Sequence, residues 1–408
     1  MKNIILNEGY QNSAPFFSKG KNDKIFINKK SYIDLSNCAG SLILGHNSFF
    51  YKKIIKKYFK NNYSVFSHPN THALKFSETI KKIFPNFSKI IFCNSGTEAI
   101  IKALRICEAL SSKKYVASVA GSWHGSVDQL LYYPDKKFLP RPISSGLKAT
   151  DKKNLIIIPF GDEKLSKKIL DKKKNKIKCL IIEPIQASLP GSHSKKYLKF
   201  LEKYCKINDI ILIFDEIITG VRSDNFSVQN NYSLKPDITI AGKILGGGLP
   251  FGIIGISKKI DKFLKEKKLP VFFGGTFSGN SFVTFLGNEI LTYLIKNKKK
   301  LKELNAKSEF FEKNLNNFFI EKNIDVKIYR YASLLRIVFT RKKIINRIQR
   351  DFIENQHSVK IKKFRSYLFR NNIFYSTSGV VFFSIMTSNN SVNNVIKHIK
   401  NGIFKYFR

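Results

Sequence analysis

Short runs of β-branched and other apolar residues alternate with helical periodicity between about residues 50 and 290 of this chain. The runs cover residues 90–92, 115–119, 155–158, 179–182, 210–214, 238–241 and 253–256. Short buried strands separated by helices predict a mostly parallel sheet that is covered on both faces. Because ligands of such sheets bind beyond the carboxyl ends of the strands, we expect the chemistry just after each run.

The two ends of the chain differ from this pattern. Residues 1–50 contain one short strand at 31–35, and residues 290–408 open with a long basic helix over about 288–319. Strand-like pieces at 326–329, 334–339 and 380–385 and a final helix from about residue 392 follow. We expect both ends to pack together as a smaller α+β domain beside a large α/β domain over residues 51–289.

Lysine and arginine total 72 residues against 29 aspartates and glutamates, which gives a net charge of +43. Such a charge is typical of binding to nucleic acid or an anionic surface. The lysines are spread along the whole chain, however, and do not form one stripe or tail. We therefore predict no specific nucleic-acid partner, although the positive potential would attract a phosphorylated cofactor or an acidic substrate.

The five cysteines, Cys38, Cys93, Cys107, Cys179 and Cys205, have no C-x-x-C spacing. They predict buried free thiols in a reducing compartment, and no cluster of ligands indicates a metal site. Residues 1–10 hold only the apolar run 4–6, which is too short for a signal peptide. No apolar stretch approaches the roughly 18 residues of a membrane span, so a cytoplasmic protein is expected.

Two polar segments with glycine follow predicted strands. Residues 94–99 read N-S-G-T-E-A and open a helix, and Ser95 with Glu98 matches a capping box. The N–H groups of such a helix start attract phosphate, although an ordinary capped helix has the same pattern. Residues 121–125 read G-S-W-H-G and hold the single tryptophan, Trp123. Its ring would stack on a flat heterocycle or pack in the core beside a turn.

Two further strands lead directly to charged residues. The strand at 210–214 ends in Asp215 and Glu216, and a buried carboxylate there needs a cation or a proton donor. A pyridinium nitrogen, an arginine or a lysine would each meet that need. The strand at 238–241 leads through Gly242 to Lys243, and a triple glycine follows. A lysine desolvated in such a turn has a lowered pKa and becomes an amine nucleophile and base.

The order and spacing of these motifs resemble the class III aminotransferase family of pyridoxal-phosphate enzymes. The motifs N-S-G-T-E-A, W-H-G, E-P, F-D-E-I-x-T-G-x-R, G-K-x-x-G-G-G-x-P and G-T-x-S-G-N follow one another within about residues 30–290. Within the family the likeness is greatest to the glutamate-1-semialdehyde 2,1-aminomutases. The resemblance implies the aspartate aminotransferase-like fold of such transferases and a homodimer with a shared active site.

The resemblance also implies a role for each matching residue. Lys243 would form a Schiff base with pyridoxal 5'-phosphate, and Asp215 would pair with the pyridine nitrogen, which makes the ring an electron sink. The remaining cofactor-binding residues would be Ser95, Gly96 and Thr97 at the phosphate, Trp123 and Ile217 on the two ring faces, His124 and Glu183 beside the site, and Thr276 at the phosphate of the neighbouring subunit. Residues 126–148 look like the lid of the aminomutases.

Three positions depart from the aminomutase pattern. Residues 12–17 read N-S-A-P-F-F and lack an arginine that would grip the substrate carboxylate, Gly379 stands where a glutamate is expected, and Ser188 replaces an asparagine. These departures favour an aminotransferase that moves an amino group between an amino donor and a small carbonyl acceptor without the usual carboxylate contact. The alternative is an aminomutase, which forms 5-aminolevulinate with no external donor. The intact Lys243 and Asp215 argue against an inactive relative.

Overall fold

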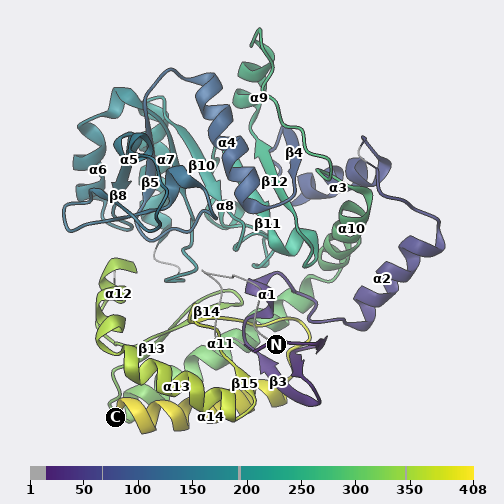
Figure 1. Cartoon of the computed structure of the whole chain (residues 1–408), viewed down its shortest axis with the longest axis vertical. Coiled ribbons are helices and arrows are strands. Elements are labelled where there is room, and N and C mark those ends of the chain that lie inside the picture. The colour runs from purple at the N-terminus through teal and green to yellow at the C-terminus, as the bar shows by residue number, and fades with distance from the viewer. Residues whose placement is uncertain (1–14, 67, 192–193, 345–346) are drawn as a thin grey trace.

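The computed structural model describes residues 15–66, 68–191, 194–344 and 347–408. A seven-stranded sheet with the order β4-β12-β11-β10-β9-β5-β8 forms the centre of the larger part (Figure 1). Its strands are β4 (Lys89–Cys93), β5 (Tyr115–Val119), β8 (Leu155–Ile158), β9 (Ile177–Ile182), β10 (Ile211–Asp215), β11 (Ile238–Gly242) and β12 (Gly252–Ile256). Neighbouring strands are parallel except at β12, which runs antiparallel to β11 and β4. The prediction of a mostly parallel sheet is confirmed.

Helices cover both faces of this sheet, which explains why the central strands are mostly apolar. Alternate residues of a strand point to opposite faces. On β10, Ile211 and Ile213 pack with α4 (Gly96–Leu110), while Leu212 and Phe214 pack with α7 (Lys195–Ile207). The other helices of this part are α3 (Thr71–Ile83), α5 (Ala149–Asn154), α6 (Glu163–Asp171), α8 (Val228–Tyr232), α9 (Lys258–Lys265) and α10 (Ser281–Lys296).

Segments from both ends of the chain form the smaller part, at the bottom of Figure 1. One sheet joins β1 (Lys19–Lys21), β2 (Lys24–Ile27), β3 (Lys30–Asp34) and β15 (Ile373–Phe374), with β15 parallel to β3. Another joins β13 (Lys327–Tyr331), β14 (Leu334–Val338) and β16 (Val380–Phe382). The helices here are α1 (Asn37–Gly40), α11 (Lys298–Glu321), α12 (Arg347–Gln356), α13 (Ser358–Arg370) and α14 (Asn389–Phe407), and α2 (Phe49–Lys60) extends to one side. The predicted α+β part built from both ends is confirmed, while its exact boundaries stay a prediction.

The single long helix predicted over residues 288–319 is wrong. The chain forms α10 and α11 instead, and the break falls at Asn297, whose backbone φ is −120° and ψ is 48°. Its side-chain amide and its backbone N–H both donate to the carbonyl of Tyr293, at 2.8 and 2.9 Å, so the residue closes the first helix. An asparagine favours such local bonds over a continuing helix.

Two further features complete the fold. The strands β6 (Tyr132–Pro134) and β7 (Pro140–Pro142) form a hairpin within the segment that resembles a lid. In the ranges that the structure describes, no helix is both long enough and apolar enough to cross a membrane.

Candidate active site

Polar residues gather where strands of the seven-stranded sheet end. Lys243 follows β11, Asp215 ends β10, and Glu183 follows β9. The segment after β5 carries Trp123 and His124, and α4 begins shortly after β4. The sheet therefore delivers all of these groups to one edge, where the structure joins most of them by hydrogen bonds.

The amine of Lys243 lies in a partly enclosed position. Its Nζ donates a hydrogen bond to the carbonyl of Ala39 at 3.0 Å, and its backbone φ is +46°. Burial lowers the pKa of Lys243 to about 8, and the positive charge of Arg222 acts in the same direction, against the carboxylates of Glu183 and Asp215. Near neutral pH a useful fraction of this amine is therefore uncharged and nucleophilic.

The carboxylate of Asp215 is only 4% exposed. Its Oδ2 lies 2.7 Å from Nδ1 of His124, and its Oδ1 accepts a hydrogen bond from the backbone N–H of Ile217 at 3.1 Å. Within the described ranges no lysine or arginine forms an ion pair with it, and the other ring nitrogen of His124 is buried without a hydrogen-bond partner. Asp215 can therefore stabilise a cation that this chain does not itself supply.

The neighbouring Glu216 has a structural role. It accepts hydrogen bonds from the backbone N–H groups of Val228 and Gln229, at 2.8 and 3.1 Å, and from the hydroxyl of Thr219 at 2.9 Å. The sequence placed two carboxylates at this strand end, and the structure separates them, because only Asp215 points toward the other polar groups.

Glu183 connects two of the segments at the sheet edge. Its Oε1 accepts from the backbone N–H of Trp123 at 2.5 Å, and its Oε2 accepts from that of Ala187 at 3.1 Å. Burial, followed by the charge of Asp215, raises the pKa of Glu183 to about 7. Glu183 thus fixes the backbone ahead of His124 and titrates close to neutral pH.

The N-terminus of α4 carries the predicted serine cap, but the Glu98 carboxylate bonds the residue before the cap. Ser95 Oγ accepts from the backbone N–H of Glu98 at 3.1 Å, and the Glu98 carboxylate accepts from that of Asn94 at 2.8 Å. A Cβ on Gly96 would lie 2.8 Å from Cδ1 of Ile217. The start of this helix therefore touches Ile217 directly, and a larger residue at position 96 would displace the end of the Ile217 side chain.

Thr97 joins α4 to the segment after β5. Its hydroxyl accepts from the backbone N–H of Ser126 at 3.2 Å, and a side chain at Gly125 would overlap it. Gly125 also has a φ of +69°, so both its conformation and its surroundings require glycine. The start of α4 is thereby held against the loop that carries His124.

Trp123 and Thr276 are both exposed. The side chain of Trp123 is 51% exposed, so it is not a core residue. Thr276 lies in an exposed loop that α4 holds through hydrogen bonds from Lys102 to the carbonyl of Phe273 and from Arg105 to that of Phe272, each 2.8 Å long. No hydrogen bond between described residues joins Thr276 to Lys243 or Asp215.

The turn over α1 is a part of the site that the sequence did not reveal. Asn37, Cys38, Ala39 and Gly40 have consecutive positive φ angles of 42°, 52°, 53° and 80°. The Asn37 amide donates to the carbonyl of Phe382 at 2.6 Å, which ties the turn to β16. Cys38 is exposed in this turn, so the expectation that it is buried is wrong, whereas the other four cysteines are buried.

Arg222 is a second residue whose role was not predicted, although the motif F-D-E-I-x-T-G-x-R contains it. It is fully buried, and its Nε and Nη2 donate to the carbonyls of Ile218 and Gly40 at 2.8 and 2.7 Å. Its guanidinium carbon lies 4.9 Å from the ring centre of Phe382. Its charge contributes to the lowered pKa of Lys243.

Comparison with known sequences places the chain in a family. The sequence model described as "Aminotransferase class-III" matches residues 5–346. The chain is 32% identical over 343 residues to glutamate-1-semialdehyde 2,1-aminomutase of Methanocaldococcus jannaschii, covering 83% of this chain and 79% of that protein. It is 34% identical over 331 residues to the protein of the same name from Wigglesworthia glossinidia brevipalpis, covering 79% and 75%.

Solved structures share the fold. An omega-transaminase from Sphaerobacter thermophilus superposes with a TM-score of 0.89 at 21% identity, over 97% of this chain and 92% of that one. A glutamate-1-semialdehyde-aminomutase from Pseudomonas aeruginosa PAO1 gives a TM-score of 0.86 at 16% identity, over 98% and 89%. The predicted fold class is therefore confirmed.

Proposed function

The chain belongs to the class III aminotransferase family, and we propose that it is a pyridoxal-phosphate-dependent aminotransferase acting between an amino donor and a small carbonyl acceptor. One observation carries this proposal: a lysine of lowered pKa, Lys243, and a buried carboxylate, Asp215, meet at the edge of the sheet beside the start of α4. These are the groups that hold and activate such a cofactor.

The residues of the site fit pyridoxal phosphate. Asp215, paired only with His124 among the described residues, can stabilise a protonated ring nitrogen. The first turn of α4 presents the N–H groups of Gly96 and Thr97, which lack partners within the helix and suit a phosphate. The bound group supplies an electron sink for the pair that is released when the Cα–H bond of an amino substrate breaks.

The residues of the site would then have the following roles. Lys243 would hold the cofactor through Nζ, and its amine would take up and return the proton of the substrate Cα. A pKa of about 8 lets this amine both accept and release a proton near neutral pH. The carbonyl of Ala39 accepts a hydrogen bond from the free amine of Lys243 and orients it. Asp215, which is hydrogen-bonded to His124, would stabilise the positive charge on the ring nitrogen of the cofactor.

We also propose a homodimer. The loop around Thr276 exposes Leu269, Phe272 and Phe277, which are 83%, 75% and 60% exposed. Large apolar side chains exposed this close together in sequence are typical of an interface with another protein. If a second copy covers this loop, Thr276 reaches the phosphate site of that copy, as the resemblance implies.

An aminomutase is the second candidate, because the relatives with 32% and 34% identity carry that name. Two sequence features oppose it. The segment over residues 12–17 has no arginine, although residues 12–14 lie outside the described ranges, and position 379 is a glycine and not a glutamate.

Turnover by the purified, cofactor-loaded chain separates the two candidates. An aminotransferase needs both a donor and an acceptor, and it leaves the semialdehyde of glutamate unchanged when this is the only substrate. Rapid formation of 5-aminolevulinate from the semialdehyde alone would instead establish the aminomutase and refute the proposed reaction.

A further inference from the structure

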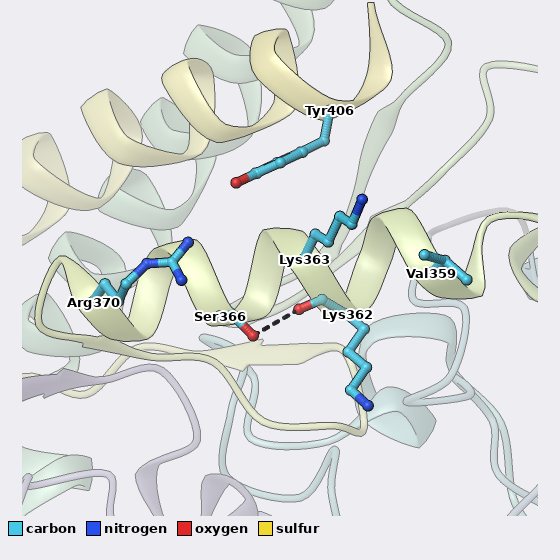
Figure 2. A pocket seen from close by; sticks show the side chains of 6 residues that line it. All are labelled: Val359, Lys362, Lys363, Ser366, Arg370 and Tyr406. Atoms are coloured by element: carbon cyan, nitrogen blue, oxygen red, sulfur yellow. Dashed lines mark hydrogen bonds between the residues drawn. The ribbon is translucent and has the colours of Figure 1, made fainter.

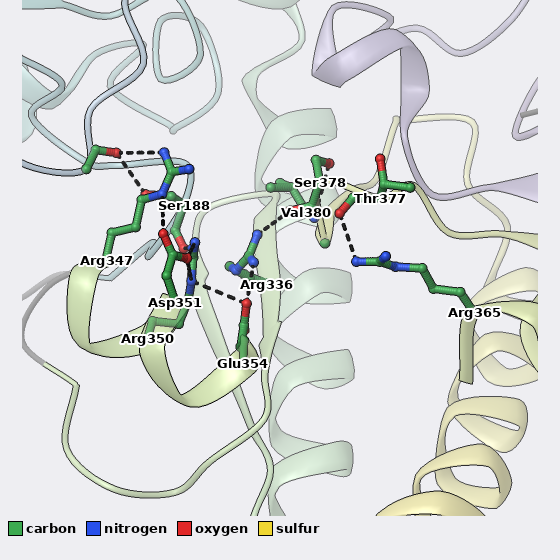
Figure 3. A network of polar contacts seen from close by, with 12 residues as sticks. Ser188, Arg336, Arg347, Arg350, Asp351, Glu354, Arg365, Thr377, Ser378 and Val380 are labelled. Carbon is green, nitrogen blue, oxygen red and sulfur yellow. Dashed lines mark hydrogen bonds and ion pairs between the residues drawn. The ribbon is translucent and has the colours of Figure 1, made fainter. Parts of the chain in front are cut away.

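Four arginines of the smaller part of the molecule belong to one network of polar contacts (Figure 3). Arg336 lies on β14, Arg347 and Arg350 on α12, and Arg365 on α13. We call these four residues the arginine cluster. The comparison with the aminomutases had suggested a site without an arginine for the substrate, so their position needs an explanation.

The cluster carries more positive than negative charge. In the ranges that the structure describes, two carboxylates, those of Asp351 and Glu354, form ion pairs with its members. Arg336 Nη2 lies 2.9 Å from Glu354, Arg347 Nε lies 3.0 Å from Asp351, and Arg350 contacts both. Arg336 and Arg350 are only 6% and 3% exposed. These two buried arginines are matched by the two carboxylates, so the surplus positive charge is on Arg347 and Arg365, where a bound anion would balance it.

Some donors of the cluster are buried and have no partner. Arg336 donates from Nη1 to the carbonyl of Ser378, and Arg365 donates from Nη2 to that of Thr377 at 2.8 Å. The Nε atoms of both arginines are buried without a hydrogen-bond partner among the described residues, as is Oε1 of Glu354. The two unpaired Nε donors of the cluster suit an oxyanion. The unpaired Oε1 of Glu354 would accept a hydrogen bond from a hydroxyl group next to that oxyanion.

The guanidinium of Arg336 occupies the space that a side chain at position 379 would need. A Cβ on Gly379 would lie 3.0 Å from Nη1 and 3.1 Å from Nη2 of Arg336. Gly379 is the position where the resemblance implies a glutamate. An arginine from β14 therefore lies at the position where the resemblance implies an acidic side chain.

On one side, the cluster is attached to the segments that lead to Trp123. Arg347 Nη1 donates to the carbonyl of Gly121 at 3.5 Å, and Arg350 donates to the carbonyl of Ser188. The Ser188 hydroxyl in turn donates to the carbonyl of Gly121 at 3.2 Å. Gly121 precedes Trp123 by two positions, so the cluster borders the loop of the site.

On the other side, strand β16 links the cluster to the lysine. Gly379 precedes Phe382 by three positions, a distance of about 10 Å in an extended strand. The Phe382 ring packs on Arg222, which donates to Gly40, and the adjacent carbonyl of Ala39 accepts from Lys243. Strand β16 and the turn over α1 therefore connect the cluster to the segment that contacts Lys243.

We propose that the arginine cluster, with Arg336 at its centre, binds an oxyanion of the substrate, a carboxylate or a phosphate, at the end remote from the reacting carbon. This assignment rests on the proposed aminotransferase function. The missing arginine of the N-terminal segment is then replaced by donors from β14 and α12, and the substrates of this chain are anionic.

A second basic region has none of these properties. Lys362, Lys363 and Arg370 line a groove of about 310 Å³ between α13 and α14, together with Tyr406 (Figure 2). All three basic side chains are exposed, and no atom among them is both buried and without a partner. This region supports no binding site, and Arg370 is a suitable control for general effects of charge.

Titration calorimetry of the cofactor-loaded chain tests the proposal, with succinate and inorganic phosphate as separate probes at constant ionic strength. The loaded chain is used because its cofactor already occupies the phosphate site at α4. We expect saturable binding of at least one probe, weakened at least about tenfold by Arg336→Gln and by Arg347→Gln and unchanged by Arg370→Gln. The probe that binds more tightly identifies the oxyanion.

Equal binding in the wild type, Arg336→Gln and Arg347→Gln, or binding of neither probe, would overturn the proposal. If Arg336→Gln does not fold, Arg347→Gln decides by the same criterion, because its side chain is 37% exposed and tolerates change more easily. The cofactor content and its borohydride-stable attachment at Lys243 are measured on the same samples. A wild type without that attachment counts against the aminotransferase, whereas intact attachment with unaltered anion binding counts only against the cluster.

Discussion

The edge of the seven-stranded sheet and the arginine cluster border the same site, but they are built in different ways. At the sheet edge, Asp215 and Lys243 lie at the ends of strands that are buried on both faces, so the core itself fixes their positions. In the arginine cluster, Arg336 and Arg350 are held by ion pairs and carbonyls from segments far apart in the chain. If both proposals hold, cofactor chemistry and substrate preference rest on different structural supports, and one can change without the other.

Lys243→Ala should reduce the rate of transamination more than any other substitution, while it leaves anion binding by the arginine cluster nearly unchanged. Without the amine, transamination should fall at least about a thousandfold, because one group acts both as nucleophile and as base. The affinity of the arginine cluster for succinate or phosphate should change less than about threefold. Steady-state rates and calorimetry measure the two quantities, and a parallel loss of anion binding would show that the regions are not independent.

Asp215→Asn should rank second. It removes the charge that faces the ring nitrogen but keeps the size of the side chain, so the rate should fall about a hundredfold or more. Asp209→Asn is the matched control, because the side chain of Asp209 is 81% exposed and lies outside the site. Rates for both variants, with cofactor content measured in parallel, test the assignment. Equal rates in the two variants would contradict it.

The sequence predicted the residues at the sheet edge but not the arginine cluster. The runs at 115–119 and 155–158 coincide with β5 and β8, because strands buried on both faces form nearly continuous apolar runs. Residues at strand ends could therefore be placed. The arginine cluster could not, since ion pairs between residues such as Arg336 and Glu354 leave no periodic pattern. The helix break at Asn297 was missed because this residue lies between Lys296 and lysines 298–300, which are compatible with the exposed face of a continuing helix.

Glu183→Gln tests the raised pKa of Glu183 through the pH dependence of stability. In the folded chain this carboxyl keeps its proton up to about pH 7, whereas its unperturbed pKa is 4.5. The folded state therefore binds more protons between these values, and wild-type stability falls as the pH rises through that window. Glutamine does not titrate. The Tm of the cofactor-free variant, relative to wild type, should thus rise by a few degrees between about pH 5 and about pH 8.

Circular dichroism melts at both pH values measure this difference. A constant offset between variant and wild type at the two pH values would mean that Glu183 is ionised throughout, and the raised pKa would be refuted.

Ser95→Ala should have the smallest effect on stability, about 1 kcal/mol from loss of the helix cap. Ser257 caps α9 in the same way, by accepting from the backbone N–H of Ile260 at 3.4 Å, but it is remote from the site. Ser95→Ala and Ser257→Ala should therefore lose similar stability, while only the first should weaken cofactor affinity. Denaturant melts and cofactor titrations give both numbers. If both variants bound the cofactor as wild type does, α4 would not be the phosphate site.

The most direct test of the whole account is to locate the cofactor on the chain. The loaded protein is reduced with borohydride, digested, and mapped by mass spectrometry. The account predicts that the added mass is on the peptide containing Lys243. A label on another buried lysine, such as Lys102 or Lys178, or no label at all, would contradict it.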